Sequence, residues 1–442
     1  MESLQTVLGP IVNSTAVTAP LHYILAGSFR SVSLFLLAFS PTTRTLSHLR
    51  TIPGFGPHQY LALPSNEFRN TVYATSWAVP PVLSSWRIEK AANPEDWNVR
   101  FLNSVPITAT SSYITIPQPY KRAYSVGGPT GEVHDLDPVD GSFGSKLQEV
   151  LFVPEDELAT ADKTRVALRY GSHGIEFTPS RQFAFVPVLG TDSIEMFEHD
   201  PDTGRLALLT SVPSPRGSGA KDGPRHLKIH PNGRVLYCVT EHTNVVDIYE
   251  ILPKSLKFRD SRSLLPDNVA AATHGSHVFR GDTLMLAPSS ASQPVPKVLI
   301  TTTRGATSAT KGWLSVFPLD SQGYFSTNPN GLQQNFANMT VDINAARWET
   351  PTSGGRANAI DLIPQTSTTI EGDDEDEDGL WIVLTDEDDA TASPNGTGAI
   401  RILEWKGWKR GLHLADEWPR KGDSDSSNDN IIQGASHAIW LN

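Results

Sequence analysis

The chain has 442 residues, including 33 glycines, 33 prolines and one cysteine, and a formal net charge of −12 at pH 7. This length allows a large core, and the frequent glycines and prolines suit many short strands, so an all-β protein is expected. The single Cys238 excludes an intrachain disulfide, residues 1–20 lack the pattern of a signal peptide, and no apolar run approaches the roughly 18 residues of a membrane span. We therefore expect a soluble, cytoplasmic protein.

The negative charge is concentrated in one region. Eleven acidic residues lie in the segments EGDDEDED (371–378) and DEDD (386–389). A run this dense repels itself and has little to bury, so residues 370–379 are expected to form a solvated loop. No basic stripe indicates nucleic-acid binding, and we expect a small-molecule partner instead.

One short pattern recurs along the chain and predicts the fold. It consists of a residue X, side chains facing one way at X+2 and X+4, and proline at X+6. Six copies are complete and a seventh lacks the proline: HQYLALP (58–64), SSYITIP (111–117), HGIEFTP (173–179), RHLKIHP (225–231), DTLMLAP (282–288), NAIDLIP (358–364) and HAIWLN (437–442). Further apolar strands follow most copies, and four short strands in a repeat of about 50 residues are typical of a β-propeller blade.

Seven copies predict a seven-bladed β-propeller over residues 21–442, preceded by an N-terminal extension, 1–20. Irregular insertions are expected at 319–350 and 365–379. Segment 21–46 has the pattern of second and third strands without a first, whereas 437–442 resembles a first strand without a second. Pairing of these N- and C-terminal strands in one sheet would complete the seventh blade and close the ring.

Residue X of each copy is expected at the mouth of the central channel, because the first strand of a blade lines the propeller axis. This ring comprises His58, Ser111, His173, Arg225, Asp282, Asn358 and His437. A second ring follows from the ends of the second strands: Trp77, Leu189, Glu241, Arg304 and Asp386. Structural positions of a repeat tend to be filled alike, whereas these positions carry varied polar side chains. Each residue alone is more often a solvated or salt-bridged group than a catalyst, but their convergence on one mouth indicates a site.

Several segments resemble a known enzyme family. YGSHGIEFTPS, DGPRHLKIHPNGRVLYCVTEHTN, ETPTSGGRANAI and HAIWLN are similar to the fungal carboxy-cis,cis-muconate cyclases, also called 3-carboxymuconate lactonising enzymes, which are lactonase-like seven-bladed propellers. The resemblance implies a metal-independent, cofactor-free intramolecular lyase or isomerase that is generally oligomeric. Its catalytic residues would correspond to His173, Arg225, Glu241 and Arg304.

Those residue types fit the chemistry that the resemblance implies. A substrate carboxylate adds to a conjugated double bond, negative charge develops as an enolate, and a proton is delivered to carbon. Arg225 and Arg304 would bind the polyanion and stabilise this charge. We expect His173 to be the general acid and Glu241 to orient it or share the role. Further ring residues are expected to bind substrate: Arg356, Asn358, His437, His58, Trp77 and Asp386.

Two departures from the family pattern leave other functions open. Arg356 and His437 stand where the family has histidine and asparagine, which suggests a different acid substrate. The alternatives are a pericyclic or lactonising cyclase of secondary metabolism, or a sugar-lactone hydrolase, on the same scaffold. A non-catalytic, protein-binding propeller is a third possibility.

Overall fold

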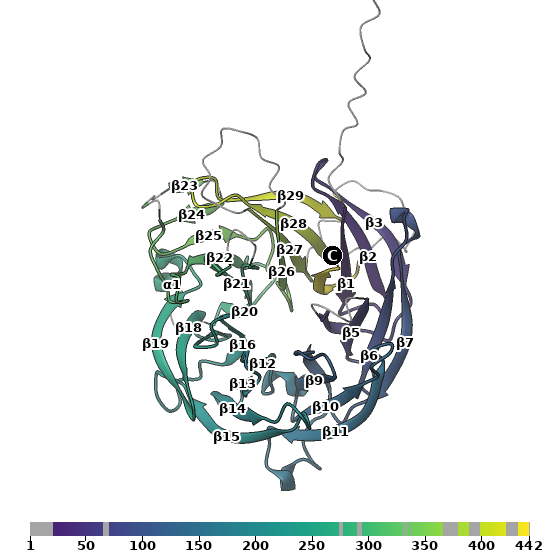
Figure 1. The fold of residues 1–442 in the computed structure, drawn as a ribbon. Coiled ribbons are helices and arrows are strands. Elements are labelled where there is room, and N and C mark those ends of the chain that lie inside the picture. The colour runs from purple at the N-terminus through teal and green to yellow at the C-terminus, as the bar shows by residue number, and fades with distance from the viewer. Residues whose placement is uncertain are drawn as a thin grey trace, which may run out of the picture.

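The structure is a computed structural model that describes residues 21–64, 70–273, 277–289, 294–329, 331, 334–336, 338–365, 379–388, 398–420 and 432–441. Within them, thirty strands form seven antiparallel sheets around a central axis (Figure 1). The predicted seven-bladed, all-β propeller is confirmed.

The blades follow one another along the chain, and the first strand of each lies nearest the axis (Figure 1). Blades 1 to 4 have four strands each. Blade 1 consists of β4 (His58–Ala62), β5 (Thr71–Ser76), β6 (Val82–Glu89) and β7 (Asn98–Pro106), and blade 2 of β8 (Ser111–Thr115), β9 (Arg122–Gly127), β10 (Thr130–Leu136) and β11 (Phe143–Leu151). Blade 3 consists of β12 (Glu176–Phe177), β13 (Phe183–Val188), β14 (Ser193–His199) and β15 (Leu206–Pro213), and blade 4 of β16 (Pro224–Ile229), β17 (Val235–Thr240), β18 (Val245–Leu252) and β19 (Ser255–Ser263).

The remaining sheets complete the ring. Blade 5 has six strands, in the order β20 (Phe279–Leu286), β21 (Val298–Gly305), β22 (Trp313–Pro318), β25 (Ala346–Glu349), β24 (Met339–Val341) and β23 (Gln334–Phe336). Blade 6 has four: β26 (Ile360–Pro364), β27 (Leu380–Asp386), β28 (Ala399–Trp405) and β29 (Leu412–Trp418). Blade 7 also has four: β30 (Ala435–Trp440), β1 (His22–Ser28), β2 (Leu34–Ser40) and β3 (Thr45–Ile52).

Helices are short and lie in the connections. They are α1 (Asp267–Ala272) and three 3₁₀ turns, η1 (Pro94–Asp96), η2 (Glu155–Glu157) and η3 (Arg165–Arg169). Across the described ranges, no helix has both the length and the apolar character needed to cross a membrane.

The hydrophobic core is divided among the blade interfaces. Seven clusters of buried apolar side chains each combine residues of two neighbouring blades. Met196 of blade 3, for example, belongs to the same cluster as Leu236 and Tyr249 of blade 4. Second strands such as β5, β17 and β27 are therefore buried on both faces, which explains their continuous apolar character. Apolar burial between blades is the main force that holds the ring together.

Blade 7 joins the two ends of the described chain, as predicted. β1 pairs with β30, and Leu25 lies opposite Ile439 and Ala26 opposite Ala438. β30 becomes the innermost strand of a sheet whose other strands come from residues 22–52. This pairing covers edges that would otherwise remain open in both segments.

Segment 319–350, expected to be an irregular insertion, extends blade 5. Its strand β25 pairs with β22, where Trp348 lies opposite Leu314, and β24 and β23 continue the sheet outward. Met339, Val341 and Trp348 pack into the core between blades 5 and 6, so this segment buries apolar surface. The predicted extension 1–20, and all but the two end residues of the insertion 365–379, lie outside the described residues.

Candidate functional site

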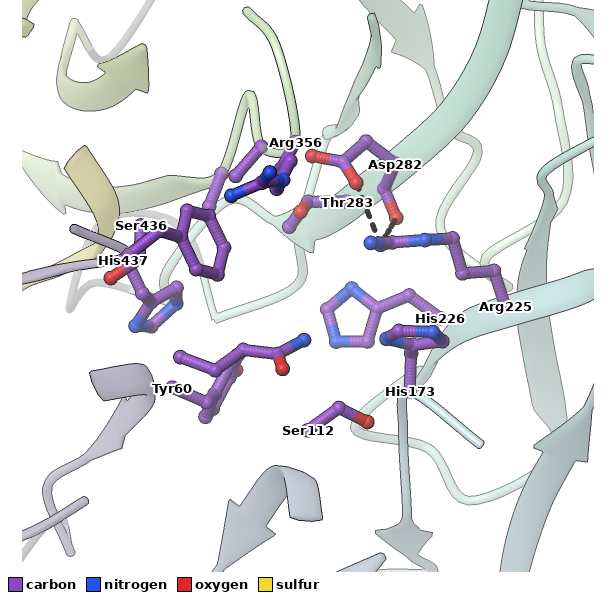
Figure 2. A pocket seen from close by; sticks show the side chains of 14 residues that line it. Tyr60, Ser112, His173, Arg225, His226, Asp282, Thr283, Arg356, Ser436 and His437 are labelled. Atoms are coloured by element: carbon purple, nitrogen blue, oxygen red, sulfur yellow. Dashed lines mark hydrogen bonds and ion pairs between the residues drawn. The ribbon is translucent and has the colours of Figure 1, made fainter. Parts of the chain in front are cut away.

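A polar pocket lies at the propeller axis and receives residues from all seven blades (Figure 2). It holds about 380 Å³ of space, including its open mouth. The lining residues are Phe29, Gln59, Tyr60, Ser112, His173, Arg225, His226, Asp282, Thr283, Arg356, Ala357, Ala359, Ser436 and His437.

β-Bulges at the start of the first strands turn residues into this pocket. In five first strands the pairing register shifts at the pocket end, and the residues skipped by the pairing are pocket-lining ones: Gln59 and Tyr60 in β4, Ser112 in β8, Arg225 in β16, Asp282 and Thr283 in β20, and Ser436 and His437 in β30. A bulge leaves a residue unpaired and redirects its side chain. Neighbouring residues can therefore both reach the axis, which strict alternation along a strand would prevent.

Arg225 is held rigidly against the pocket wall. Its Nε donates a hydrogen bond to Oε2 of Glu241 at 3.1 Å. Its Nη1 lies 2.8 Å from both the backbone oxygen and Oδ1 of Asp282. Among the described residues, Nη2 has no hydrogen-bond partner. A buried guanidinium fixed in this way is ready to bind an anionic or carbonyl oxygen through its remaining donors.

Glu241 orders the arginines behind the pocket. Besides Arg225, it accepts hydrogen bonds from Arg304 Nη2 and Arg280 Nη1, each at 3.2 Å. Burial alone would raise the pKa of this carboxyl group, but the charges of Arg304 and Arg225, with help from His173 and Arg280, lower it to about 2. Glu241 is therefore a permanent anion at neutral pH. It holds Arg225 in position, and the expected role of Glu241 beside His173 stays a prediction.

His173 lines the pocket, and its two ring nitrogens differ in their surroundings. Its Nε2 lies 2.9 Å from the backbone oxygen of Leu168, an acceptor only, so Nε2 carries the proton. Its Nδ1 is buried without a hydrogen-bond partner in the described part of the chain. Burial, followed by the charge of Arg225, lowers the pKa of His173 to about 3. In the unliganded pocket this imidazole is neutral, and the expectation that it acts as the general acid stays a prediction.

Arg356 lies at the mouth of the pocket. Its side chain is 47% exposed, and Nη1 lies 3.5 Å from Oε1 of Glu387, a carboxylate that also pairs with Arg30 at 2.7 Å. The backbone N–H of Arg356 donates to Oε2 of the same carboxylate at 2.9 Å. Glu387 thus anchors the turn that carries Arg356, and the loosely paired guanidinium is available to a ligand.

The structure places the sequence-predicted residues in two groups. His173, Arg225, His437 and Arg356 line the pocket, and Glu241 and Arg304 stand behind Arg225. Four other predicted substrate-binding residues do not line it: His58, Trp77, Asn358 and Asp386.

Each of the four has structural contacts instead. His58 is fully buried, with its ring beside Trp86, and Asp386 pairs with Arg401 at 2.6 Å. The side chain of Asn358 donates to the backbone oxygen of Thr303. Trp77 stacks on Phe29, a lining residue, and its indole donates to Gln59. Trp77 therefore supports the pocket wall from behind.

Sequence reasoning missed His226 and Arg280. Both adjoin ring positions in the sequence: His226 directly follows Arg225, and Arg280 lies two residues before Asp282. A search for polar residues beside each ring position would have found them. Throughout the described ranges, no group of three or more His, Cys, Asp or Glu side chains has the arrangement of a metal site.

The chain is a seven-bladed propeller with an axial polar pocket, and comparison with known proteins identifies its family. The family model described as "Lactonase, 7-bladed beta-propeller" matches residues 24–283. The chain belongs to this family.

Two relatives and one solved structure show how the similarity is distributed. The chain is 27% identical over 408 residues to muconate cycloisomerase 1 of Cutaneotrichosporon cutaneum, covering 90% of this chain and 94% of that protein. It is 32% identical over 151 residues to the 6-phosphogluconolactonase of Erwinia tasmaniensis, covering 32% and 45%. The structure of the periplasmic gluconolactonase of Pseudomonas aeruginosa superposes with a TM-score of 0.62 at 15% identity, covering 96% and 99%. The last similarity is one of fold.

Proposed function

We propose that the protein is a lactone hydrolase that acts on a small lactone bearing an anionic group, such as the lactone of a sugar acid. One observation carries the proposal: His173, whose Nδ1 has no hydrogen-bond partner among the described residues, lines a polar pocket that also contains Arg225. Membership of the lactonase family and the names of two of the similar proteins, 6-phosphogluconolactonase and gluconolactonase, support it.

The charges behind the pocket suit an anionic substrate. Three guanidinium groups, from Arg225, Arg304 and Arg280, pair with two carboxylates, from Glu241 and Asp282. Arg356 adds a half-exposed cation at the mouth. The excess positive charge favours binding of a carboxylate or phosphate.

The hydrolytic step assigns a role to each group. His173 Nδ1 takes a proton from water as the water oxygen bonds to the lactone carbonyl carbon. The carbonyl electrons move onto the carbonyl oxygen, and Arg225 stabilises the resulting oxyanion. When the oxyanion collapses, the bond from the carbonyl carbon to the ring oxygen breaks, and the ring oxygen takes the proton from His173. Glu241 keeps Arg225 in position.

The test measures acid release from glucono-1,5-lactone and 6-phosphogluconolactone in a pH-stat. Loss of a general base lowers the rate by about 100- to 10,000-fold, so His173→Ala is expected to lower kcat/KM by that amount. The matched control is His413→Ala, because His413 is exposed on β29 at the outer edge of blade 6. Hydrolysis that is absent in the wild type, or equally fast in His173→Ala, would refute the proposal.

A second function, cycloisomerisation of a carboxymuconate-like acid, is favoured by the 408-residue similarity to muconate cycloisomerase 1. The same base would remove a proton from the carbon beside a carboxylate, the ring C–O bond would break, and a new C=C bond would form in the open-chain acid. In the closing direction a bound polyanion would raise the pKa of His173, so that the imidazole could return the proton.

Labelled water separates the two reactions. Hydrolysis places one ¹⁸O atom from H₂¹⁸O in the product carboxylate, which mass spectrometry detects. Elimination incorporates none and produces a conjugated diene that absorbs in the ultraviolet. Turnover of carboxymuconolactone to an unlabelled, absorbing product would establish the cycloisomerase and exclude the hydrolase as the main activity.

A further inference from the structure

Three imidazoles line the pocket: His173, His226 and His437. Burial lowers the pKa of His437 to about 3 and that of His226 well below its ordinary value, and the charge of Lys228 adds to both shifts. Lys228 is fixed by an ion pair with Glu176 and by a hydrogen bond of 3.0 Å to the hydroxyl oxygen of Tyr113. The three imidazoles are therefore neutral in the unliganded pocket.

The backbone of blade 5 fixes the tautomer of His226. The N–H of Leu284 lies 3.2 Å from Nδ1 of His226, and because a backbone N–H only donates, Nδ1 must accept. A neutral imidazole has one proton, so it resides on Nε2. This Nε2–H is buried, has no partner among the described residues, and belongs to a side chain that lines the pocket.

In His437, as in His226, a backbone N–H donates to Nδ1, whereas in His173 a backbone oxygen accepts from Nε2. The N–H of Leu61 lies 3.3 Å from Nδ1 of His437, which also leaves its proton on Nε2. All three imidazoles thus carry their proton on Nε2, but in His173 the backbone oxygen of Leu168 occupies that N–H. His173 offers the pocket a lone pair, whereas His226 and His437 have Nε2–H groups free to donate.

We propose that His226 is a catalytic hydrogen-bond donor, whose Nε2–H binds the lactone carbonyl oxygen as it becomes negative when water adds to the carbonyl carbon. The inference rests on the proposed function. His226 directly follows Arg225 in β16, and Figure 2 shows its ring next to His173, between Arg225 and the centre of the pocket. A carbonyl carbon within reach of water activated by His173 therefore has its oxygen close to Arg225 and His226.

A neutral imidazole suits this position. It donates a hydrogen bond to the oxyanion without adding a further buried cation beside Arg225 and without competing for the proton that His173 must accept. In the step itself, the carbonyl electrons move onto the oxygen, the Nε2–H···O bond shortens, and the proton stays on His226. His226 contributes electrostatic stabilisation, and the proton transfer remains with His173.

Two substitutions test the roles of the two ring nitrogens of His226 separately. Asparagine can place its amide oxygen near the position of Nδ1 and keep the hydrogen bond from Leu284, but it removes the Nε2–H donor. Glutamine can place its amide N–H near the position of Nε2. Removing one donor to an oxyanion lowers kcat by about 100- to 1,000-fold, so His226→Asn is expected to lower kcat by that factor with little change in KM. His226→Gln is expected to keep at least about one tenth of wild-type kcat, and thermal unfolding should show both variants folded.

Equal kcat in the two variants, or a higher kcat in His226→Asn than in His226→Gln, would overturn the proposal. The second result is the one that a purely structural role predicts, because that role depends on the nitrogen that accepts from Leu284. A second measurement does not depend on turnover. Nitrogen-15 NMR of the histidines is expected to show the Nε2–H tautomer for His226 between pH 6 and 8, and titration with gluconolactam, an unreactive amide analogue, should shift its Nε2–H signal.

The NMR result distinguishes failure of this inference from failure of the proposed function. If gluconolactam shifts the His226 signal but the wild type opens no lactone, the hydrolase assignment is wrong, but His226 is still a hydrogen-bond donor to a ligand in the pocket. If gluconolactam binds and His226 is unaffected, or if His226 carries its proton on Nδ1, the inference is wrong even if the enzyme is a lactonase.

Discussion

His173 and His226 show that identical side chains acquire opposite chemical character through their backbone partners. The backbone oxygen of Leu168 accepts the Nε2–H of His173, which leaves Nδ1 of that ring with a lone pair. The backbone N–H of Leu284 donates to Nδ1 of His226, which leaves that ring with a free Nε2–H. The sequence pattern predicted that residue 173 lies at the channel mouth, and His173 lines the pocket, but the carbonyl of Leu168, from the preceding 3₁₀ turn, follows no repeat. Donor and acceptor roles therefore could not be predicted.

The pKa of His173 predicts an unusual pH dependence. An imidazole with the ordinary pKa of 6.5 would be about 99% protonated at pH 4.5 and inactive as a base. Because the pKa of His173 is lowered to about 3, the neutral form, which is the active one in the proposed hydrolysis, persists as the pH falls and is lost only near pH 3. We expect kcat/KM for glucono-1,5-lactone to stay nearly level between pH 7 and 4.5, measured in the pH-stat.

The control for this profile is circular dichroism at each pH, which ensures that the protein remains folded over the range. An acid limb centred near pH 6.5 in a folded protein would show that His173 is not the base in the free enzyme.

At the level of elements, the repeat predicted where each first strand begins but not which of its residues reach the axis. Residue 58 starts β4 as expected, yet a bulge sends Gln59 and Tyr60 to the pocket and leaves His58 buried beside Trp86. Arg225 is itself the bulged residue of β16 and was identified. A bulge is set by contacts between strands of the folded sheet, so alternation along one strand does not reveal it.

The turn before β26 controls the mouth of the pocket. Gly355 has a positive φ of 63°, and a Cβ atom at this position would lie 2.2 Å from Oε2 of Glu387. We expect Gly355→Ala to displace Glu387 and Arg356, to raise KM for an anionic lactone several-fold, and to lower the free energy of unfolding by about 1–3 kcal/mol. Steady-state kinetics and chemical denaturation measure the two effects.

Gly219→Ala is the matched control, because Gly219 also has a positive φ, 81°, but a Cβ atom there meets nothing within 4 Å. It is expected to share part of the stability loss and none of the change in KM. An unchanged KM in Gly355→Ala would show that the Glu387–Arg356 arrangement does not contribute to substrate binding.

For the whole molecule, the number of blades and the closure of the ring followed from the sequence, because apolar periodicity and the repeat length survive in a single chain. The outer strands of blade 5 could not be predicted from the sequence, because β23, β24 and β25 are very short and fall within a stretch that matches no repeat. Their place in the sheet depends on contacts of Met339 and Trp348 with blade 6, which are distant in sequence.

Closure of the ring depends strongly on Trp440. This side chain is 4% exposed, belongs to the core between blades 6 and 7, and donates from its indole to the backbone oxygen of Asp361 at 3.2 Å. Replacing a buried tryptophan by alanine costs about 3–5 kcal/mol, and we expect Trp440→Ala to lower the free energy of unfolding by that amount in urea denaturation.

Leu208→Ala serves as the comparison, because Leu208 lies on β15 at the outer edge of blade 3 and is 60% exposed. It is expected to change the unfolding free energy by less than about 0.5 kcal/mol. Similar losses in both variants would mean that the seventh blade does not limit the stability of the ring.

The pairing of β30 with β1 also sets the order in which the pocket is completed during synthesis. Ser436 and His437 line the pocket, and they belong to the strand of highest residue number among the thirty described. The sheet formed by residues 22–52 therefore lacks its innermost strand until residues 435–440 pair with β1. A complete pocket wall thus requires the joining of segments about 400 residues apart in the sequence.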